Sequence, residues 1–233
     1  MTPALNPALD LNALAQAYGR DRRIHIPAIL TEGSAQRVHQ CLTQETDYSL
    51  LCQSGPDQAV AWPVAGLTPQ KEVELMNGAY GRARDKFEYL YDAHSLSREG
   101  EPYPDPSHYL AAINRFLNGP AMLDFARRLT GHPEIAATSI QATRYRPGHF
   151  LNQHDDINDV RRVAAFVLNM TPHWRADWGG ALLFCDRPGH ISEGFLPAFN
   201  ALNMFTVPQQ HQVGFVSPFA GAYRFSVTGW FLR

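Results

Sequence analysis

The sequence predicts a mainly β fold, a sandwich or barrel, whose core is supported by helices from the first part of the chain. Before about residue 131, apolar residues recur mostly at helical spacings. After Gly131-His132-Pro133, short β-rich runs alternate with turn residues up to the end of the chain. No Pro/Gly/Ser-rich linker separates the two parts. We therefore expect one domain over 1–233, with 1–135 as mostly helical support and 136–233 as the β core.

The first part of the chain carries helix signals with a few strand-like stretches between them. Thr31 has the side chain that a helix N-cap prefers, and Asn118-Gly119-Pro120 separates two later helices. Apolar residues at helical spacings predict one long helix from 69 to 94; they are Val73, Met76, Tyr80, Phe87 and Leu90. In chain order we expect a helix over 11–18, a strand over 23–30, a helix over 31–44, short strands within 47–65, and helices over 69–94, 106–117 and 121–129.

The second part of the chain contains six runs rich in β-branched and aromatic residues. Turn residues separate them at the spacing that a sandwich or barrel gives. The expected strands are 138–145, 162–170, 181–184, 201–207, 212–216 and 222–232.

Composition and charge narrow the class of protein. A hydrophobic fraction of 45% and a charged fraction of 18% are typical of a globular chain. The net charge of −2 gives no basic field, so we expect neither nucleic acid nor an acidic membrane as a partner. Three widely spaced cysteines indicate reduced thiols and a cytoplasmic protein. The longest apolar run, 163–168, is too short to span a bilayer.

The strongest candidate site begins with the chain's single His-x-Asp, His154 and Asp156. On an extended segment, side chains two residues apart point to the same face, so this imidazole and carboxylate could bind one ion. A second histidine, His211, lies far downstream in Val-Pro-Gln-Gln-His-Gln-Val. Two histidines and one carboxylate on one face of a metal are the ligands of non-haem Fe(II) oxygenases. The plainer interpretation is a His-x-Asp in a surface turn and a solvated His211.

Arg224 carries further information because of the strand in which it lies. Alternation places Arg224, Ser226, Thr228 and Trp230 on one face of that strand, opposite an apolar face. If the apolar face packs on the core, the arginine turns into the barrel, where it needs an anionic partner. A carboxylate would supply that partner in bidentate geometry, with Ser226 or Thr228 as an additional donor. The alternative is an edge strand with its polar face in water.

Tyr145 precedes His154 by nine residues, and Pro147-Gly148 turns the chain between them. Its phenol could reach the same anion, or it could pack as an ordinary aromatic core residue. The motif Trp178-Gly179-Gly180 reads equally as a plain β-turn and as a segment that lines the site.

Taken in order, these features resemble the 2-oxoglutarate- and Fe(II)-dependent oxygenases, over about residues 138–233. Within them, the chain looks most like the prolyl-hydroxylase branch, in particular the catalytic domain of ribosomal-protein prolyl 3-hydroxylases. The shared motifs are His154-Asp155-Asp156, Arg161-Arg162 before an apolar strand, Gly179-Gly180, His211-Gln212-Val213 and the ending Arg-x-Ser-x-x-Gly-Trp-Phe.

The resemblance implies a double-stranded β-helix, or jelly roll, that holds Fe(II) and uses 2-oxoglutarate and dioxygen, with ascorbate as an accessory reductant. It implies His154, Asp156 and His211 as the metal ligands. It also implies that Arg224 binds the distal carboxylate of 2-oxoglutarate, assisted by Tyr145 and Thr228. The expected activity is hydroxylation of a prolyl residue in a protein or peptide, with release of succinate and CO2.

Two other functions fit parts of the pattern. The first keeps the chemistry but takes a free amino acid or small metabolite, which needs a closed pocket where a peptide needs an open cleft. The second is a non-catalytic jelly-roll or cupin-like binding module in which the histidines are incidental. Because such a module does not require Arg224 to face the histidines, the orientation of Arg224 discriminates it from an oxygenase.

Overall fold

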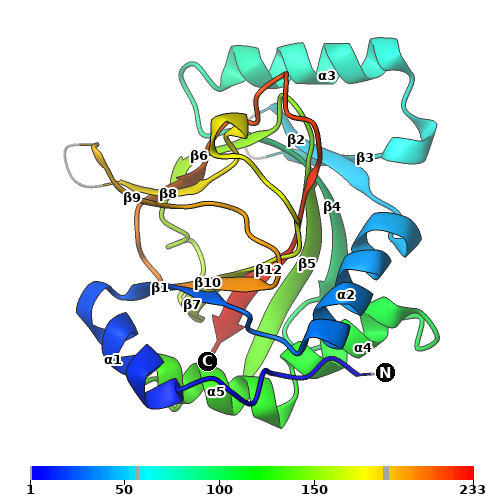
Figure 1. Ribbon diagram of the computed structural model, residues 1–233. Coiled ribbons are helices and arrows are strands. Elements are labelled where there is room, and N and C mark those ends of the chain that lie inside the picture. Colours follow the sequence, from blue (N-terminus) through cyan, green and yellow to red (C-terminus); the bar gives the residue numbers. More distant parts are fainter. Residues whose placement is uncertain (1, 56–57, 186–188) are drawn as a thin grey trace.

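The computed structural model describes residues 2–55, 58–185 and 189–233 and is drawn in Figure 1. In this part of the chain the strands pair antiparallel in the order β1-β10-β7-β12-β5-β4-β6-β11-β8-β9, with β2 beside β4 and β3 beside β2. Their bounds are β1 Arg23–Pro27, β2 Ser49–Gly55, β3 Gln58–Pro63, β4 Tyr89–Ser97, β5 Ala137–Tyr145, β6 Phe150–His154, β7 Arg162–Asn169, β8 Leu182–Cys185, β9 Ile191–Phe195, β10 Ala201–Thr206, β11 His211–Val213 and β12 Arg224–Leu232. The sheet curls into a nearly closed barrel, which confirms the predicted jelly-roll class.

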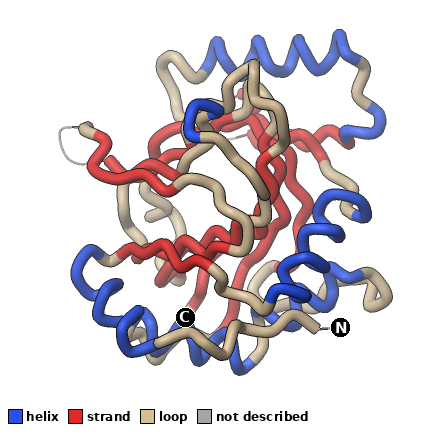
Figure 2. Tube along the Cα trace, in the orientation of Figure 1, coloured by secondary structure: helices blue, strands red, loops and turns tan. Residues whose placement is uncertain are grey.

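The helices lie outside the strands, as Figure 2 shows. They are α1 Leu11–Asp21, α2 Glu32–Gln40, α3 Pro69–Arg82, α4 Tyr109–Leu117 and α5 Pro120–Thr130, with short turns at Cys41–Glu45, Val64–Gly66 and Ala176–Trp178. In Figure 1, α3 lies across one end of the barrel, and the other four helices gather toward the opposite side. Capping residues define the ends of two of these helices. The Asp10 side chain accepts hydrogen bonds from backbone N–H groups at the start of α1, and Gly131, at φ +77°, ends α5.

The main core lies between these helices and the outer face of the sheet. Leu110 and Ile113 of α4 and Phe125 of α5 belong to the same buried cluster as Val227 and Phe231 of β12. Each such side chain contributes about 1.5–3 kcal/mol through burial of apolar surface. Because this apolar face of β12 is taken up by the core, alternation turns its other face inward, as the sequence predicted.

The first part of the chain contributes more strand than its helical spacings indicated. The helix expected over 69–94 ends at Arg82, and 89–97 forms β4, which pairs with β2, β5 and β6. The helical prediction for 83–94 is therefore wrong. Tyr89 and Tyr91 alternate with the buried Leu90 and Asp92, which is strand periodicity. Strand β1 likewise pairs with β10 of the second part.

A buried ion-pair cluster holds β4 in place. The fully buried carboxylate of Asp92 accepts from Arg144 Nε and Arg146 Nε, each at 2.8 Å, and from Arg146 Nη2 at 3.0 Å. Arg146 also pairs with Glu72 of α3. The cluster therefore ties α3 and β4 to the end of β5 and fixes the strand that forms one wall of the cavity described below.

Within the residues described above, no helix has both the length and the apolar character needed to cross a membrane.

Candidate active site

A cavity of about 490 Å³ lies within the barrel. It is lined by the inward face of β12 together with residues of β4, β5, β6, β7 and β11. The three implied metal ligands and the three implied co-substrate contacts lie on its walls: Tyr145, His154, Asp156, His211, Arg224 and Thr228. Trp178, Gly179 and Gly180 are not among its lining residues. Residues far apart in the chain are thus brought to one place by the closure of the sheet.

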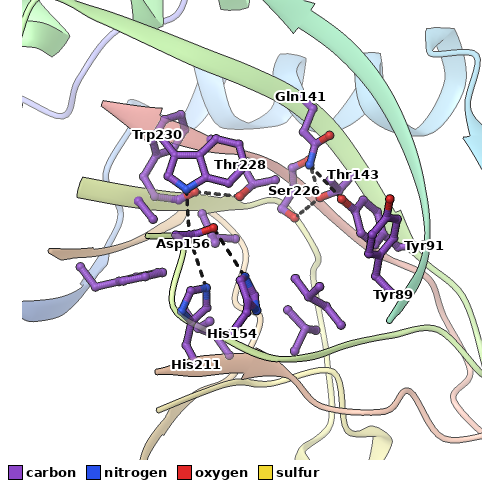
Figure 3. A pocket seen from close by; sticks show the side chains of 18 of the residues that line it. Tyr89, Tyr91, Gln141, Thr143, His154, Asp156, His211, Ser226, Thr228 and Trp230 are labelled. Atoms are coloured by element: carbon purple, nitrogen blue, oxygen red, sulfur yellow. Dashed lines mark hydrogen bonds and ion pairs between the residues drawn. The ribbon is translucent and has the colours of Figure 1, made fainter. Parts of the chain in front are cut away.

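His154 and His211 face each other across two neighbouring strands. His154 ends β6, His211 begins β11, and the two are direct antiparallel partners with ring centroids 4.1 Å apart. Each Nε2 lies 3.6 Å from an oxygen of Asp156, His154 from Oδ1 and His211 from Oδ2. One candidate ligand atom from each of the three residues lies within 4.8 Å of the others. Figure 3 shows the two imidazoles converging on the carboxylate.

The second nitrogen of each imidazole is held by the backbone. His154 Nδ1 lies 2.9 Å from the carbonyl oxygen of Asn152, and His211 Nδ1 lies 2.8 Å from that of Gln209. A carbonyl only accepts, so each Nδ1 carries a proton, and each Nε2 is the nitrogen that faces Asp156. This is the tautomer and orientation that a metal-binding histidine requires.

Asp156 reaches the histidines by a different route from the one expected. The sequence argument placed it on an extended segment with His154, but β6 ends at His154 and Asp156 lies in the following turn at φ +63°. The expected convergence is therefore present, and its geometric reason was wrong. Asp is among the residues that tolerate this left-handed conformation, which folds the carboxylate back over the imidazoles.

The surroundings of His211 favour its neutral form, which is the form that binds a metal. Burial, reinforced by the neighbouring His154, lowers the pKa of His211 to about 4, although the Asp156 carboxylate opposes the shift. His211 is therefore neutral near pH 7, the form that binds metals. Two imidazoles and one carboxylate with the cavity open beside them fit an Fe(II) ion.

Arg224 lies deep in the same cavity and is only 1% exposed. Among the described residues, its Nε and Nη1 have no hydrogen-bond partner. Its guanidinium carbon lies 4.9 Å from the ring centroid of Tyr145, and burial lowers the pKa of Arg224. Burial also raises the pKa of Tyr145, so the phenol keeps its proton and can donate. A buried guanidinium with two unused donors is suited to an anionic ligand.

Thr228 and Ser226 continue the inward face of β12. The Thr228 hydroxyl lines the cavity but donates to the carbonyl of Phe166 at 2.9 Å, so in this arrangement its proton is not directed at a ligand in the cavity. The Ser226 hydroxyl lies 2.7 Å from that of Thr143 on β5. The inward orientation of Arg224 also separates this protein from a binding module in which the arginine has no relation to the histidines.

The sequence reasoning missed an aromatic wall formed by β4 and by Phe87, which lies just before this strand. Phe87, Tyr89 and Tyr91 line the cavity one after another, with the Tyr91 ring stacked on Tyr145 at 5.2 Å. Phe87 lies 5.4 Å from the His154 ring and is 43% exposed at the cavity mouth. The alternation of aromatic residues at 87, 89 and 91 was the signal for this wall, but the helical spacing masked it.

Comparisons with known proteins agree with this geometry. Residues 140–232 match the 2OG-Fe(II) oxygenase superfamily profile. An 85-residue stretch is 36% identical to prolyl 3-hydroxylase OGFOD1 of Mus musculus; it covers 34% of this chain but only 15% of that protein.

Solved structures show a similar fold at low identity. A prolyl-4-hydroxylase of Pseudomonas putida superposes with a TM-score of 0.60 at 18% identity, covering 96% of this chain and 99% of the other. A prolyl hydroxylase of Trichoplax adhaerens, in complex with a hypoxia inducible factor peptide fragment, gives 0.63 at 16% identity, covering 95% and 88%. The profile match and the His-Asp-His cluster show that the chain carries a 2OG-Fe(II) oxygenase domain over residues 140–232, and the solved structures show that the chain shares the fold of the two prolyl hydroxylases.

Proposed function

We propose that this protein hydroxylates a prolyl residue of a protein or peptide. The reaction consumes dioxygen and 2-oxoglutarate and yields the hydroxylated residue, succinate and CO2. In this proposal His154, Asp156 and His211 hold Fe(II), and Arg224 binds the distal carboxylate of 2-oxoglutarate.

One observation carries the proposal: the three candidate ligands share one cavity with a buried arginine, two of whose nitrogens have no hydrogen-bond partner among the described residues. Either feature alone has ordinary explanations. Together they supply a metal-binding face and a separate anion anchor, which are the two requirements for a chelating dicarboxylate. The remaining open volume then serves the substrate.

The chain's own residues have distinct tasks in this reaction. When bound, Fe(II) supplies the oxidising chemistry that couples the decarboxylation of 2-oxoglutarate to hydroxylation of a C–H bond. The guanidinium of Arg224 pairs with the distal carboxylate in a fork, and the protonated phenol of Tyr145 assists it. Thr228 lines the same cavity. The aromatic wall excludes water from the side of the cavity formed by β4.

The choice of a prolyl substrate rests on the relatives and on the cavity mouth. Enzymes named prolyl hydroxylases are among both the sequence relatives and the similar structures. At the mouth, Phe87 and Ile157 are 43% and 62% exposed beside His154, so an apolar ring entering the site would contact apolar side chains. We further propose that residues 1–233 act as one catalytic unit in the cytoplasm, where the buried thiols of Cys41 and Cys52 stay reduced.

Measuring succinate tests this function. The metal-free protein is loaded with Fe(II) and incubated with 2-oxoglutarate, with and without candidate substrates. The panel contains proline-containing peptides from the translation machinery, the same peptides with proline replaced by alanine, and free proline. We expect succinate formation to rise with the proline peptides only, and the peptide product to gain one oxygen by mass spectrometry.

Two variants serve as controls. Asp156→Ala should abolish succinate formation, because the only carboxylate of the cluster is lost. Asp159→Asn is the matched control, since Asp159 lies in the same loop but pairs with Arg161 outside the cavity. Stimulation by free proline and not by peptides would support the metabolite hydroxylase instead. Equal turnover by wild type and Asp156→Ala would overturn the oxygenase assignment of these residues.

A further inference from the structure

The Asp156 carboxylate is held by two side chains that the proposed function does not use. Its Oδ2 accepts from the indole Nε1 of Trp230 at 2.9 Å, and its Oδ1 accepts from Arg162 Nη1 at 3.1 Å. Each oxygen therefore has one donor from outside the cluster, and each also lies 3.6 Å from an imidazole nitrogen. Figure 3 shows the contact with Trp230.

The two holding side chains also support each other. The guanidinium carbon of Arg162 lies 3.8 Å from the centroid of the Trp230 ring, so the planar cation covers the indole. Arg162 Nη1 additionally donates to the backbone oxygen of Asp156 at 3.3 Å and to Asn158 Oδ1 at 2.8 Å. Arg162 begins β7 and Trp230 lies on its neighbour β12, so both arise from the rigid sheet.

Asp156 needs this support more than a residue on a strand would. It lies in a turn at φ +63°, beyond the last paired residue of β6, where the backbone alone does not fix the direction of the side chain. An aspartate there could rotate its carboxylate away from the imidazoles or pair wholly with Arg162. A conformation of this kind persists when surrounding contacts determine it, and here those contacts come from Arg162 and Trp230.

We propose that Trp230 and Arg162 are positioning residues that fix the Asp156 carboxylate for metal binding. The inference rests on the proposed metal site and adds two residues that contact one of its ligands from outside. Of the two residues, Trp230 gives the clearer test of positioning, because its indole is a neutral donor. It orients the carboxylate without adding a positive charge that would repel the metal. Arg162 donates a charged hydrogen bond to the same carboxylate, and its guanidinium also fixes the orientation of the Trp230 ring by stacking on it.

Metal affinity of Trp230→Phe tests the inference without relying on turnover. Phenylalanine keeps an aromatic ring but removes the N–H donor to Asp156. The metal-free full chain is titrated with Co(II), whose visible absorption reports coordination, and with Fe(II) under nitrogen. We expect the Kd of both metals to rise by about 10- to 100-fold, the usual cost of losing a hydrogen-bond partner of a metal ligand. The melting temperature of the metal-free variant should stay close to that of wild type.

Trp62→Phe is the matched control. Trp62 lies on β3, is 39% exposed, and also has a cation over its ring, the Lys71 ammonium at 5.0 Å. It touches neither Asp156 nor the cavity, so its replacement should leave the metal affinity unchanged. If Trp230→Phe does not fold, Arg162→Lys replaces it. Lysine keeps the charge but cannot lie flat on the indole, so weaker metal binding is again expected, and wild-type affinity would contradict the proposal.

A spectroscopic signature provides an independent measurement. The chain has four tryptophans, so tryptophan labelled with ¹⁵N gives four indole N–H signals, and Trp230→Phe identifies the one of interest. We expect that signal to exchange slowly with solvent and to move when Zn(II) is added, whereas the Trp62 signal stays in place. A Trp230 signal that ignores the metal would overturn the inference.

The failures of the two proposals are distinguishable. If wild type and Asp156→Ala bind Co(II) equally, the metal site itself is wrong, and the proposed function fails with it. If metal binding depends on Asp156 but Trp230→Phe binds as tightly as wild type, the metal site stands and only the positioning role is rejected.

Discussion

Replacing Arg224 with methionine should change stability and 2-oxoglutarate binding in opposite directions. Arg224 is 1% exposed, and two of its nitrogens have no partner among the described residues. Methionine has a similar length and needs no partner, so it removes a desolvation cost. The same substitution removes the proposed anchor of the co-substrate.

The structure sets the expected magnitudes. An unsatisfied buried donor costs about 1–3 kcal/mol, and the lost contact with Tyr145 offsets roughly 1–2 kcal/mol of the gain. We therefore take a net stabilisation of about 1–2 kcal/mol, or several degrees in Tm at roughly 2–4 °C per kcal/mol. Removing one partner of a desolvated charge pair costs about 2–5 kcal/mol, so the Kd for 2-oxoglutarate should rise roughly 30- to 5,000-fold.

The assay is thermal unfolding of the Zn(II)-loaded protein with and without 2-oxoglutarate, combined with calorimetric titration of the ligand. Wild type should melt at a lower temperature than Arg224→Met without ligand and gain stability when ligand is added, whereas Arg224→Met should not respond. Arg224→Lys keeps the charge but not the fork, and we expect intermediate affinity. An Arg224→Met protein that melts below wild type yet still gains stability from 2-oxoglutarate would refute the reasoning.

Three further predictions concern the scaffold. Asp92→Asn should destabilise the protein by about 3–5 kcal/mol, measured by urea unfolding, because two partly buried arginines lose the buried carboxylate that they share. Burial lowers the pKa of His149 to about 4, below the value of about 6.5 in an unfolded chain, so the unfolded state binds the proton first and stability falls as pH decreases from about 6.5 toward 4. His149→Phe should make that decline shallower in unfolding curves at pH 7 and pH 5. Gly229→Ala should lower Tm, because a Cβ would lie 1.9 Å from the backbone oxygen of Ser139, whereas Gly33→Ala, with open space around it, should not.

The prediction of the fold succeeded where the signal was local. Strand β12 shows this clearly: its inward Arg224 and its outward Val227 and Phe231 follow from a period of two, which is a property of the chain itself. The prediction failed at β4. Phe87 and Leu90 continue, by chance, the helical spacing of the apolar residues of α3, although α3 ends at Arg82. That segment is a strand because its neighbours β2, β5 and β6 offer hydrogen bonds and burial, and no local pattern records such neighbours.

By itself, the sequence determined which side chains could form the site: the His154-x-Asp156 pair, His211, and Arg224 on the polar face of a strand. Only the tertiary structure decided how they meet. His154 and His211 face each other because β6 and β11 pair in one register, and a shift by one residue would turn one imidazole away. Asp156 joins them through a turn, and contacts from Arg162 and Trp230 hold its carboxylate. Strand register and contacts between distant strands depend on closure of the whole sheet, which local periodicity does not encode.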